Sequence, residues 1–482
     1  MTSTTKGESN GAATQAPPKI THLTMADRVA AGKAARAQTP RTAHSQLEPM
    51  TGRDPVALIE QEGVGRLEEL LPIRNYRMLT SAFAFYRGTA SLMARDLVSC
   101  PSTSLRVQLC GDAHLSNFGG FASPDRTLVF DLNDFDETLP GPFDWDVKRL
   151  AASFEIAGRY RGLPSPECRA LALGTVAAYR QAMRDFAGMA NLAVWYSRLD
   201  AVGIAARLQE FGNKKAAKTF QRQADKARSK DSTKALTRLT QLVDGEPRII
   251  SQPPLVVPIE EVVGAAFSRE QIETAVREII RTYRRSLQND RRHLLEQYRF
   301  VDMARKVVGV GSVGSRCWIA LLLGRDETDP LVLQIKEAGE SVLEPYLGKS
   351  RFANHGQRVV EGQRLMQASS DIFLGWIRNR EGIDGVARDF YVRQLWDWKT
   401  SVDLDTIQPP GLALYATVCG WTLARAHARS GDSVAIASYL GKSDVFDRAV
   451  GEFANAYADL AESDFHELEQ AASDGRITTR EG

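Results

Sequence analysis

Cysteine is scarce in this 482-residue chain, and its pattern excludes two common classes of small structural site. The five cysteines are scattered, and none stands in a Cys-x-x-Cys spacing: Cys100, Cys110, Cys168, Cys317 and Cys419. Such a set predicts neither a disulfide framework nor a zinc site, and it is typical of a reducing compartment. We therefore expect a cytoplasmic protein.

Long apolar runs and an excess of charge of one sign are also missing. No stretch is long enough to span a bilayer, and the first residues, MTSTTKGESNGAATQAPPK, lack the apolar core of a secretory signal. The formal net charge is only +2, so composition gives no indication of binding to nucleic acid or to a membrane surface. We expect neither of these partners.

Composition and hydrophobic patterning divide the chain into five segments. They are a disordered Ser/Thr/Pro-rich tail (1–48), a mainly helical part with two motif strands (49–185), a charged helical segment (186–300), a strand-rich lobe (301–400) and a helical C-terminal part (401–482). The most basic stretch, 213–238, is typical of a solvated helix face. The mixture of helical and strand patterns predicts an α+β fold.

The block VQLCGDAHLSNFGGFASPDRTLVFDLNDFD (107–136) carries the strongest chemical signal. It places Asp112 and Asn117 five positions apart on a loop that follows a predicted strand. Phosphoryl transfer uses such a pair, because a carboxylate accepts the proton of the attacking hydroxyl and a neutral oxygen helps to hold a metal ion. A polar turn closed by an Asx cap is the alternative interpretation.

A second predicted strand, TLVFDL, runs into the acidic sequence NDFD at 133–136. A carboxylate at this place would bridge Mg²⁺ to nucleotide phosphates. Asp131 fits the shorter spacing from Asn117, whereas Asp134 fits the Asp-Phe pair and the spacing to Asp146 downstream. We favour Asp134 as the metal ligand and keep Asp131 as the alternative.

A second motif lies about two hundred residues later, in residues 306–336. It contains three glycines and a serine in a spacing of the Gly-x-Gly-x-x-Gly type: Gly309, Gly311, Ser312 and Gly314. A dinucleotide-binding turn requires a helix directly after the glycines. Here a strand follows, then a turn and another strand that ends near Lys336, which indicates a β-hairpin folded over phosphates. The alternative for Lys336 is a surface lysine at a strand end.

Two further elements would complete a nucleotide site. In kinases the strand lysine is paired with an acid on the next helix. Glu361 in RVVEGQR is the first candidate, and Glu340 and Glu344 are the alternatives. The strand FYVRQL resembles a kinase hinge, where adenine would meet the backbone near Gln394 and Leu395.

The GDAHLSN block resembles the His-Gly-Asp-x-His-x-x-Asn motif of aminoglycoside phosphotransferases and related small-molecule kinases. In this resemblance Asp112 is the catalytic base, His114 is the second histidine and Asn117 is a metal ligand. Cys110 stands where that family has its first histidine. The resemblance implies ATP and Mg²⁺ as cofactors and a small molecule as the acceptor.

The order of the motifs differs from that of ordinary kinases, in which the glycine-rich stretch comes first. The helix GLALYATVCGWTLARAHARSGD resembles the one that leads into a catalytic loop, yet no such loop follows it. The resemblance therefore implies a protein-kinase-like, two-lobed fold in circularly permuted order. Its large lobe would be mainly helical, its small lobe an antiparallel sheet, and the 411–430 helix would lie beside residues 105–117.

The chain from about residue 50 to 470 also resembles a bacterial family, domain of unknown function 2252. The blocks that carry this resemblance are FAFYRG, GDAHLSNFG, NDFDE, WDVKRLAAS, QIKEA, RVVEGQR and YVRQL. It implies no particular activity, so the functional expectation comes from the kinase-like motifs. We expect an ATP- and Mg²⁺-dependent phosphotransferase acting on a small hydroxyl compound. The alternatives are an AMP-transferring enzyme with the same site and a nucleotide-binding pseudokinase scaffold.

Two arginines in the helical sequence RNYRMLTSAFAFYRG have an open role. Arg77 and Arg87 stand among apolar residues. They would either clamp a phosphate or an acidic substrate, or pair internally with carboxylates.

Overall fold

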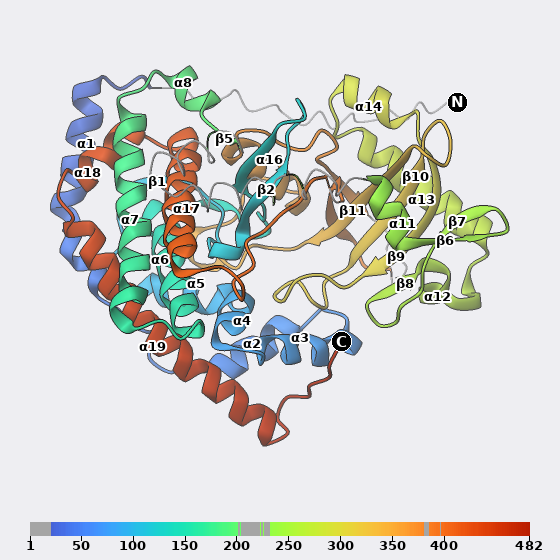
Figure 1. Cartoon of the computed structure of the whole chain (residues 1–482), viewed down its shortest axis with the longest axis horizontal. Helices are drawn as coiled ribbons and strands as arrows, with labels where there is room; N and C mark the ends of the chain where they lie inside the picture. Colours follow the sequence, from blue (N-terminus) through green and yellow to red (C-terminus); the bar gives the residue numbers. More distant parts are fainter. Residues whose placement is uncertain are drawn as a thin grey trace, which may run out of the picture.

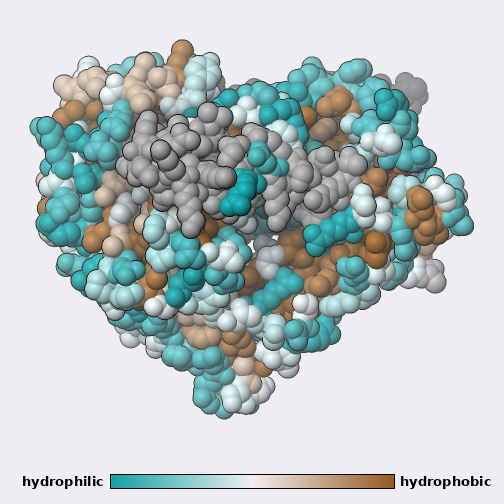
Figure 2. All heavy atoms as spheres, viewed as in Figure 1, coloured by the Kyte–Doolittle hydropathy of each residue, from teal (hydrophilic) through white to brown (hydrophobic). Residues whose placement is uncertain are grey.

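The computed structural model describes residues 21–200, 232–379, 385–395 and 397–482, together with residues 203, 222 and 225. It has two parts, a helical body and a sheet-based part beside it (Figure 1). Hydrophilic residues cover most of the outer face seen in Figure 2, with apolar residues scattered among them. The segment 213–238, predicted to be a basic helix face, lies mostly outside the described residues.

The helical body takes its helices from both ends of the described chain. They are α1 (Met25–Gln38), α2 (Pro55–Gly63), α3 (Leu71–Met78), α4 (Ala82–Gly88), α5 (Ala90–Ser99), α6 (Phe143–Tyr160), α7 (Ser165–Ala187), α8 (Asn191–Tyr196), α17 (Pro409–Ser430), α18 (Ser433–Leu440) and α19 (Val445–Ser473). Nearly every residue of α6 is buried, because α7, α17, α19 and α4 all pack on it. A side chain at Gly420 would collide with the Thr175 carbonyl, so this glycine allows α17 and α7 to pack closely.

Two small sheets within the body carry the loops of the first motif. The strands are β1 (Arg106–Leu109), β2 (Phe118–Ala122), β3 (Leu128–Leu132), β4 (Leu139–Pro142) and β5 (Leu199–Asp200). β1 pairs with β4, and β2, β3 and β5 form an antiparallel sheet. The loop after β1 leads into β2 and the loop after β3 leads into β4, so both loops connect the two sheets.

The sheet-based part is a six-stranded antiparallel sheet in the order β12-β13-β11-β10-β9-β8. Its strands are β8 (Val256–Pro258), β9 (Arg299–Lys306), β10 (Cys317–Leu323), β11 (Pro330–Ala338), β12 (Gly375–Asn379) and β13 (Arg388–Gln394). The apolar sequences CWIALLL and LVLQI form β10 and β11, which are buried on both faces as continuous apolar strands require. The register places Cys317 opposite Lys336, so the lysine lies directly beside the end of the glycine-rich loop.

Further elements cover or extend this sheet. They are α11 (Ser232–Leu239), the hairpin of β6 (Thr240–Val243) and β7 (Glu246–Ile249), α12 (Ile259–Val263), α13 (Arg269–Arg284), α14 (Asn289–Leu295) and α16 (His355–Met366). The short helix α15 (Glu344–Leu347) packs instead on α5 and β4 of the helical body. α13 packs on β12, and α16 packs on β12, β13 and α17, which links the sheet to the helical body. The prediction of an α+β fold with antiparallel strands is confirmed.

The end of α17 meets the start of β1, as expected from the kinase-like helix pattern. The backbone N–H of Gln108 donates to Ser430 Oγ at 3.2 Å, and Gly431 lies against Val107. Tyr415, in the same helix, donates to the carbonyl of Leu115 at 2.7 Å. Segments about three hundred residues apart in the chain are therefore adjacent in space.

The prediction of a disordered tail over residues 1–48 is wrong for residues 25–38, which form α1. The Ala-rich sequence favours a helix, and Thr24 and Asp27 cap its start reciprocally. The helix is held against α18, where Arg36 donates to the Tyr439 carbonyl at 2.8 Å. Among the helices of the described residues, none is long and apolar enough to cross a membrane.

A buried arginine joins the N-terminal helices to α19. Arg53 binds Asp96 at 2.8 Å and also pairs with Asp464, and both carboxylates are almost fully buried. Arg53→Leu would leave these two charges unpaired, so we expect a loss of about 3–5 kcal/mol in the free energy of unfolding. Urea denaturation followed by circular dichroism measures it.

The exposed pair of Arg476 with Glu60 links the same two regions and provides a matched control. Arg476→Leu should cost less than about 1 kcal/mol, because an exposed ion pair is screened by water. An equal effect of the two substitutions would contradict a structural role for the buried pair.

Candidate active site

A cleft of about 380 Å³ lies between the helical body and the six-stranded sheet. Its lining takes residues from both predicted motifs and from the hinge strand, including Arg87, Ser116, Asn117, Asp134, Gly309, Ser312, Lys336, Gln394, Leu395 and Lys399. The cleft therefore brings together seven of the thirteen residues that the sequence assigned to the site, although they are widely separated in the chain. The other six do not line it: Asp112, His114, Asp131, Gly311, Gly314 and Glu361.

The loop after β1 is fixed by an aspartate at the start of α6. Asp146 accepts the N–H groups of Cys110 at 2.8 Å and of Gly111 at 3.1 Å. His427, in the last turn of α17, contacts the same carboxylate at 3.2 Å. Gly111 has a φ of +84° and lies against Glu137, so a side chain would be strained and obstructed there. Asp146 therefore holds this loop against the start of α6.

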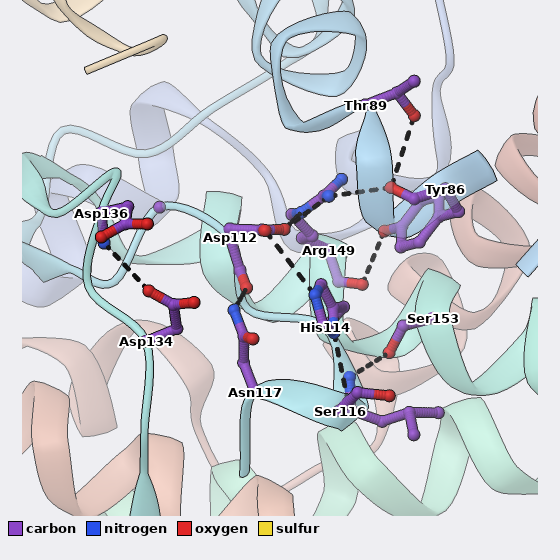
Figure 3. Close-up of polar contacts among 12 residues, drawn as sticks. Tyr86, Thr89, Asp112, His114, Ser116, Asn117, Asp134, Asp136, Arg149 and Ser153 are labelled. Atoms are coloured by element: carbon purple, nitrogen blue, oxygen red, sulfur yellow. Dashed lines mark hydrogen bonds and ion pairs between the residues drawn. The ribbon is translucent and has the colours of Figure 1, made fainter. Parts of the chain in front are cut away.

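Asp112 is held by an arginine of α6 (Figure 3). Arg149 contacts its Oδ1 through Nε at 2.6 Å and through a terminal nitrogen at 2.5 Å, and it also donates to the Tyr86 carbonyl. Burial raises the pKa of Asp112 above its ordinary value, and the charge of Arg149 limits the rise. One carboxylate oxygen is thus bound to Arg149, while Oδ2 is left for another contact.

His114 faces that second oxygen. Its Nδ1 accepts the N–H of Ser116 at 3.2 Å, so we place the ring proton on Nε2, which lies 3.6 Å from Asp112 Oδ2. Burial and the charges of Arg87 and Arg149 hold the pKa of His114 well below its usual value, so the ring is neutral. His114 is therefore a neutral neighbour of the Asp112 carboxylate and adds no charge beside it.

Asn117 and Asp134 border one space beside Asp112 (Figure 3). Asn117 donates its amide Nδ2 to the Asp112 carbonyl at 2.6 Å, which leaves its Oδ1 as the atom for a ligand. Burial alone would raise the pKa of Asp134, but the charges of Lys336, Arg393 and Lys399 lower it below the usual range. A neutral amide oxygen and an ionised carboxylate are oxygen donors of the kind that Mg²⁺ prefers, so these residues fit such an ion.

The alternative metal ligand, Asp131, does not reach the cleft. Its carboxylate is buried, pairs with Arg425 of α17, and accepts the N–H groups of Ala368 and Leu132 at 2.9 Å. Its hydrogen bonds are those of a structural carboxylate that joins β3 to α17 and to the end of α16. The alternative assignment of Asp131 as a metal ligand is therefore wrong.

Lys336 points from β11 into the loop that follows β3. Its Nζ contacts Asp136 at 2.6 Å and Asp134 at 3.9 Å, and Tyr391 donates to the other oxygen of Asp136 at 2.7 Å. Burial by itself would lower the pKa of Lys336, but the two carboxylates raise it well above its usual value. The lysine is buried and charged, so the surface interpretation is excluded.

The predicted acid partner of this lysine is wrong. Glu361 of α16 pairs with Arg364 at 3.4 Å, while Asp136 takes the place beside Lys336. The alternative Glu344 lies near Arg358 at 3.8 Å. The sequence pattern predicted that the acid lies on the next helix, whereas in the structure it lies in the loop after β3.

The glycine-rich loop connects β9 to β10, and its glycines have different surroundings. Gly309 and Ser312 line the cleft, whereas Gly311 and Gly314 face the N-terminal segment. Gly309 and Gly314 have φ values of +69° and +90°, which a side chain would disfavour. Glycine therefore allows the loop backbone to border the cleft at Gly309 and to lie close to the N-terminal segment at Gly311 and Gly314.

The hinge differs from the prediction in one respect. Gln394 and Leu395 line the cleft, but their N–H groups are already used. The N–H of Gln394 donates to the Asp371 carboxylate, and that of Leu395 donates to the Val332 carbonyl at 2.8 Å. An adenine ring would thus find neither of these donors free, so a backbone contact at the predicted residues would have to use their carbonyl groups.

Several residues of the site were not assigned from the sequence. Asp136 and Arg149 lie inside quoted blocks, next to residues that were assigned, but their partners are distant in the chain. Arg393 donates to Gln334 Oε1 and to the Asn133 carbonyl at 2.9 Å, and so joins the sheet to the NDFD loop. Desolvation and the charge of Arg393 lower the pKa of Lys399 to about 8. Local sequence carries no signal for such contacts between segments that are far apart in the chain.

Arg149→Met tests the electrostatic role of the arginine. Removing the charge should raise the pKa of Asp112 further, by about 1–3 units, because burial then acts without compensation. Carbon-13 NMR titration of aspartate carboxyls measures this, with Asp112→Asn to assign the signal. Arg159→Met is the control on the same helix, and it removes surface pairs with Asp459 and Glu462. It should leave the pKa of Asp112 unchanged. An unchanged titration in Arg149→Met would contradict the assignment.

Comparison with known proteins adds the family. No curated protein and no solved structure matches the chain. One family model, described as "Uncharacterized protein conserved in bacteria (DUF2252)", matches residues 66–471, which include every element of the cleft described above. The chain therefore belongs to the DUF2252 family.

Proposed function

We propose that this protein is an ATP- and Mg²⁺-dependent phosphotransferase that acts on a small hydroxyl-bearing molecule, with a kinase-like site in circularly permuted order. The observation that carries the proposal is the contact of Lys336 with Asp134 and Asp136, 200 residues away in the chain, at the cleft that the glycine-rich loop also lines. The junction of α17 with β1 supports the permuted order, because it joins the two segments that are continuous in ordinary kinases.

In the proposed reaction each residue has one task. Asp112 Oδ2 accepts the proton of the acceptor hydroxyl, whose oxygen forms a bond to the terminal phosphorus while the bond to the bridging oxygen breaks and ADP leaves. Asn117 and Asp134 would hold a magnesium ion, which would neutralise charge on the phosphates. Lys336 contributes a fixed positive charge to the phosphate end of the cleft.

Transfer of AMP is a second candidate, favoured by one observation. The N–H groups of Gln394 and Leu395 are occupied, so these donors do not fix the base end of a nucleotide in the usual kinase direction. Incubation with ATP labelled at the α- or the γ-phosphate, with a library of small alcohols and with the protein itself as acceptor, distinguishes the reactions. Transfer of the γ-label supports the phosphotransferase and transfer of the α-label supports AMP transfer. Binding of ATP without any transfer supports the scaffold alternative.

Asp112→Asn should separate binding from chemistry. The substitution keeps the size of the side chain and removes the proton acceptor, so turnover should fall by about 10²–10⁴-fold while Mg-ATP affinity changes little. Calorimetry and label transfer on the same preparation measure the two quantities. Wild-type turnover in the variant would exclude Asp112 as the base.

The pair Asp134→Asn and Asp131→Asn tests the metal site. Asp134→Asn removes a charged ligand, so nucleotide affinity should depend less on Mg²⁺ and turnover should fall. Asp131→Asn should lower the unfolding midpoint, because it weakens the buried pair with Arg425, and leave the Mg²⁺ dependence intact. If neither variant alters the Mg²⁺ dependence, the proposed metal site is refuted.

A further inference from the structure

Arg87, in the last turn of α4, is a cation of the cleft whose guanidinium has no carboxylate partner among the described residues. Its Nε is buried and makes no hydrogen bond, and the guanidinium carbon lies 5.9 Å from the centre of the Phe83 ring. An arginine stays charged in a protein, and a half-buried charge without a partner is costly. The side chain is therefore arranged for a negative group that enters the cleft.

The position of Arg87 indicates which negative group this is. Its backbone lies against the glycine-rich loop. A Cβ atom added at Gly311 would lie 3.4 Å from the carbonyl oxygen of Arg87. Its charge also acts on Asp112 and on His114 of the catalytic loop. Arg87 thus lies where the loop proposed to cover the phosphates meets the proposed base. Asp112 does not need this charge, because Arg149 already binds it.

Two other arginines of the N-terminal region bind the backbone of the glycine-rich loop. Arg66 donates to the Gly311 carbonyl at 2.6 Å and to the Val313 carbonyl at 2.8 Å. Arg77 donates to the Gly309 carbonyl at 2.7 Å. Because α4 also packs on α6 and α19, the segment 66–88 ties the loop to the helical body and holds Arg87 between them.

We propose that Arg87 binds the terminal phosphoryl group of the nucleotide, so that the site distinguishes a nucleoside triphosphate from a diphosphate. This inference rests on the proposed function. The planar guanidinium binds phosphate oxygens with two parallel hydrogen bonds, and a fixed cation at the transferred group stabilises the charge that develops there. Lys336, held by Asp134 and Asp136 at the sheet, binds the phosphates that remain on the nucleotide.

The test compares the affinities of Mg-ADP and of the Mg²⁺ complex of the non-hydrolysable triphosphate AMP-PNP by calorimetry on the full chain. Arg87→Gln should weaken AMP-PNP binding about 10- to 100-fold and ADP binding less than about 3-fold. Arg95→Gln, on α5 of the same helical region and outside the cleft lining, should change neither affinity. Lys336→Met should weaken both ligands alike.

The outcomes separate the inference from the proposed function. Equal effects of Arg87→Gln on ADP and AMP-PNP, or no effect, overturn the inference while nucleotide binding by the wild type still supports the proposed function. A wild type that binds neither nucleotide overturns both. An unfolding midpoint lower than that of Arg95→Gln also overturns the inference, because it would show an internal partner. Arg87→Lys, which keeps the charge, should recover part of the preference for AMP-PNP.

Discussion

The ion pair between the buried Lys336 and the half-buried Asp136 is the contact on which the arrangement of the cleft depends. It joins β11 of the sheet to the loop after β3 in the helical body, and Tyr391 secures the second oxygen of Asp136. A buried pair is stable only when its geometry is good and its remaining hydrogen-bonding groups are satisfied, and Tyr391 supplies that condition here. Because the pair spans the two parts, any movement of the sheet changes the position of Asp134 as well.

Arginines balance the other buried carboxylates around this contact. Arg149 binds Asp112, Arg425 binds Asp131, and each pair connects elements that are distant in the chain. These pairs specify one arrangement, because a different packing would leave a charge buried without its partner. The cleft is different in character. Within the described residues, its Arg87 has no carboxylate partner, and the pKa of Lys399 is lowered.

The same logic explains how the glycine-rich loop is held. Arg66 and Arg77 bind its carbonyl groups from the N-terminal helices, and glycine at 311 and 314 allows the two backbones to come close. The N-terminal helices are themselves tied to α19 through Arg53. The two ends of the described chain therefore cooperate to position a loop that lies in its middle.

Sequence patterns alone predicted the α+β composition, the strands around the glycine-rich stretch and several residues of the cleft. Local patterns carry this information, because apolar runs, glycines and the spacing of Asp112 and Asn117 reflect the conformation of short segments. The proximity of α17 to β1 also followed from pattern, since both segments resemble parts that are continuous elsewhere.

Only the tertiary structure decided which charges pair. It placed Asp136 rather than Glu361 beside Lys336, and it engaged the hinge N–H groups with Asp371 and Val332. It also showed that Asp131 is structural and that residues 25–38 are helical. An acidic residue has the same local signature in each of these roles. Its partner comes from a segment hundreds of residues away, so the choice depends on burial and distance, which exist only after the chain has folded.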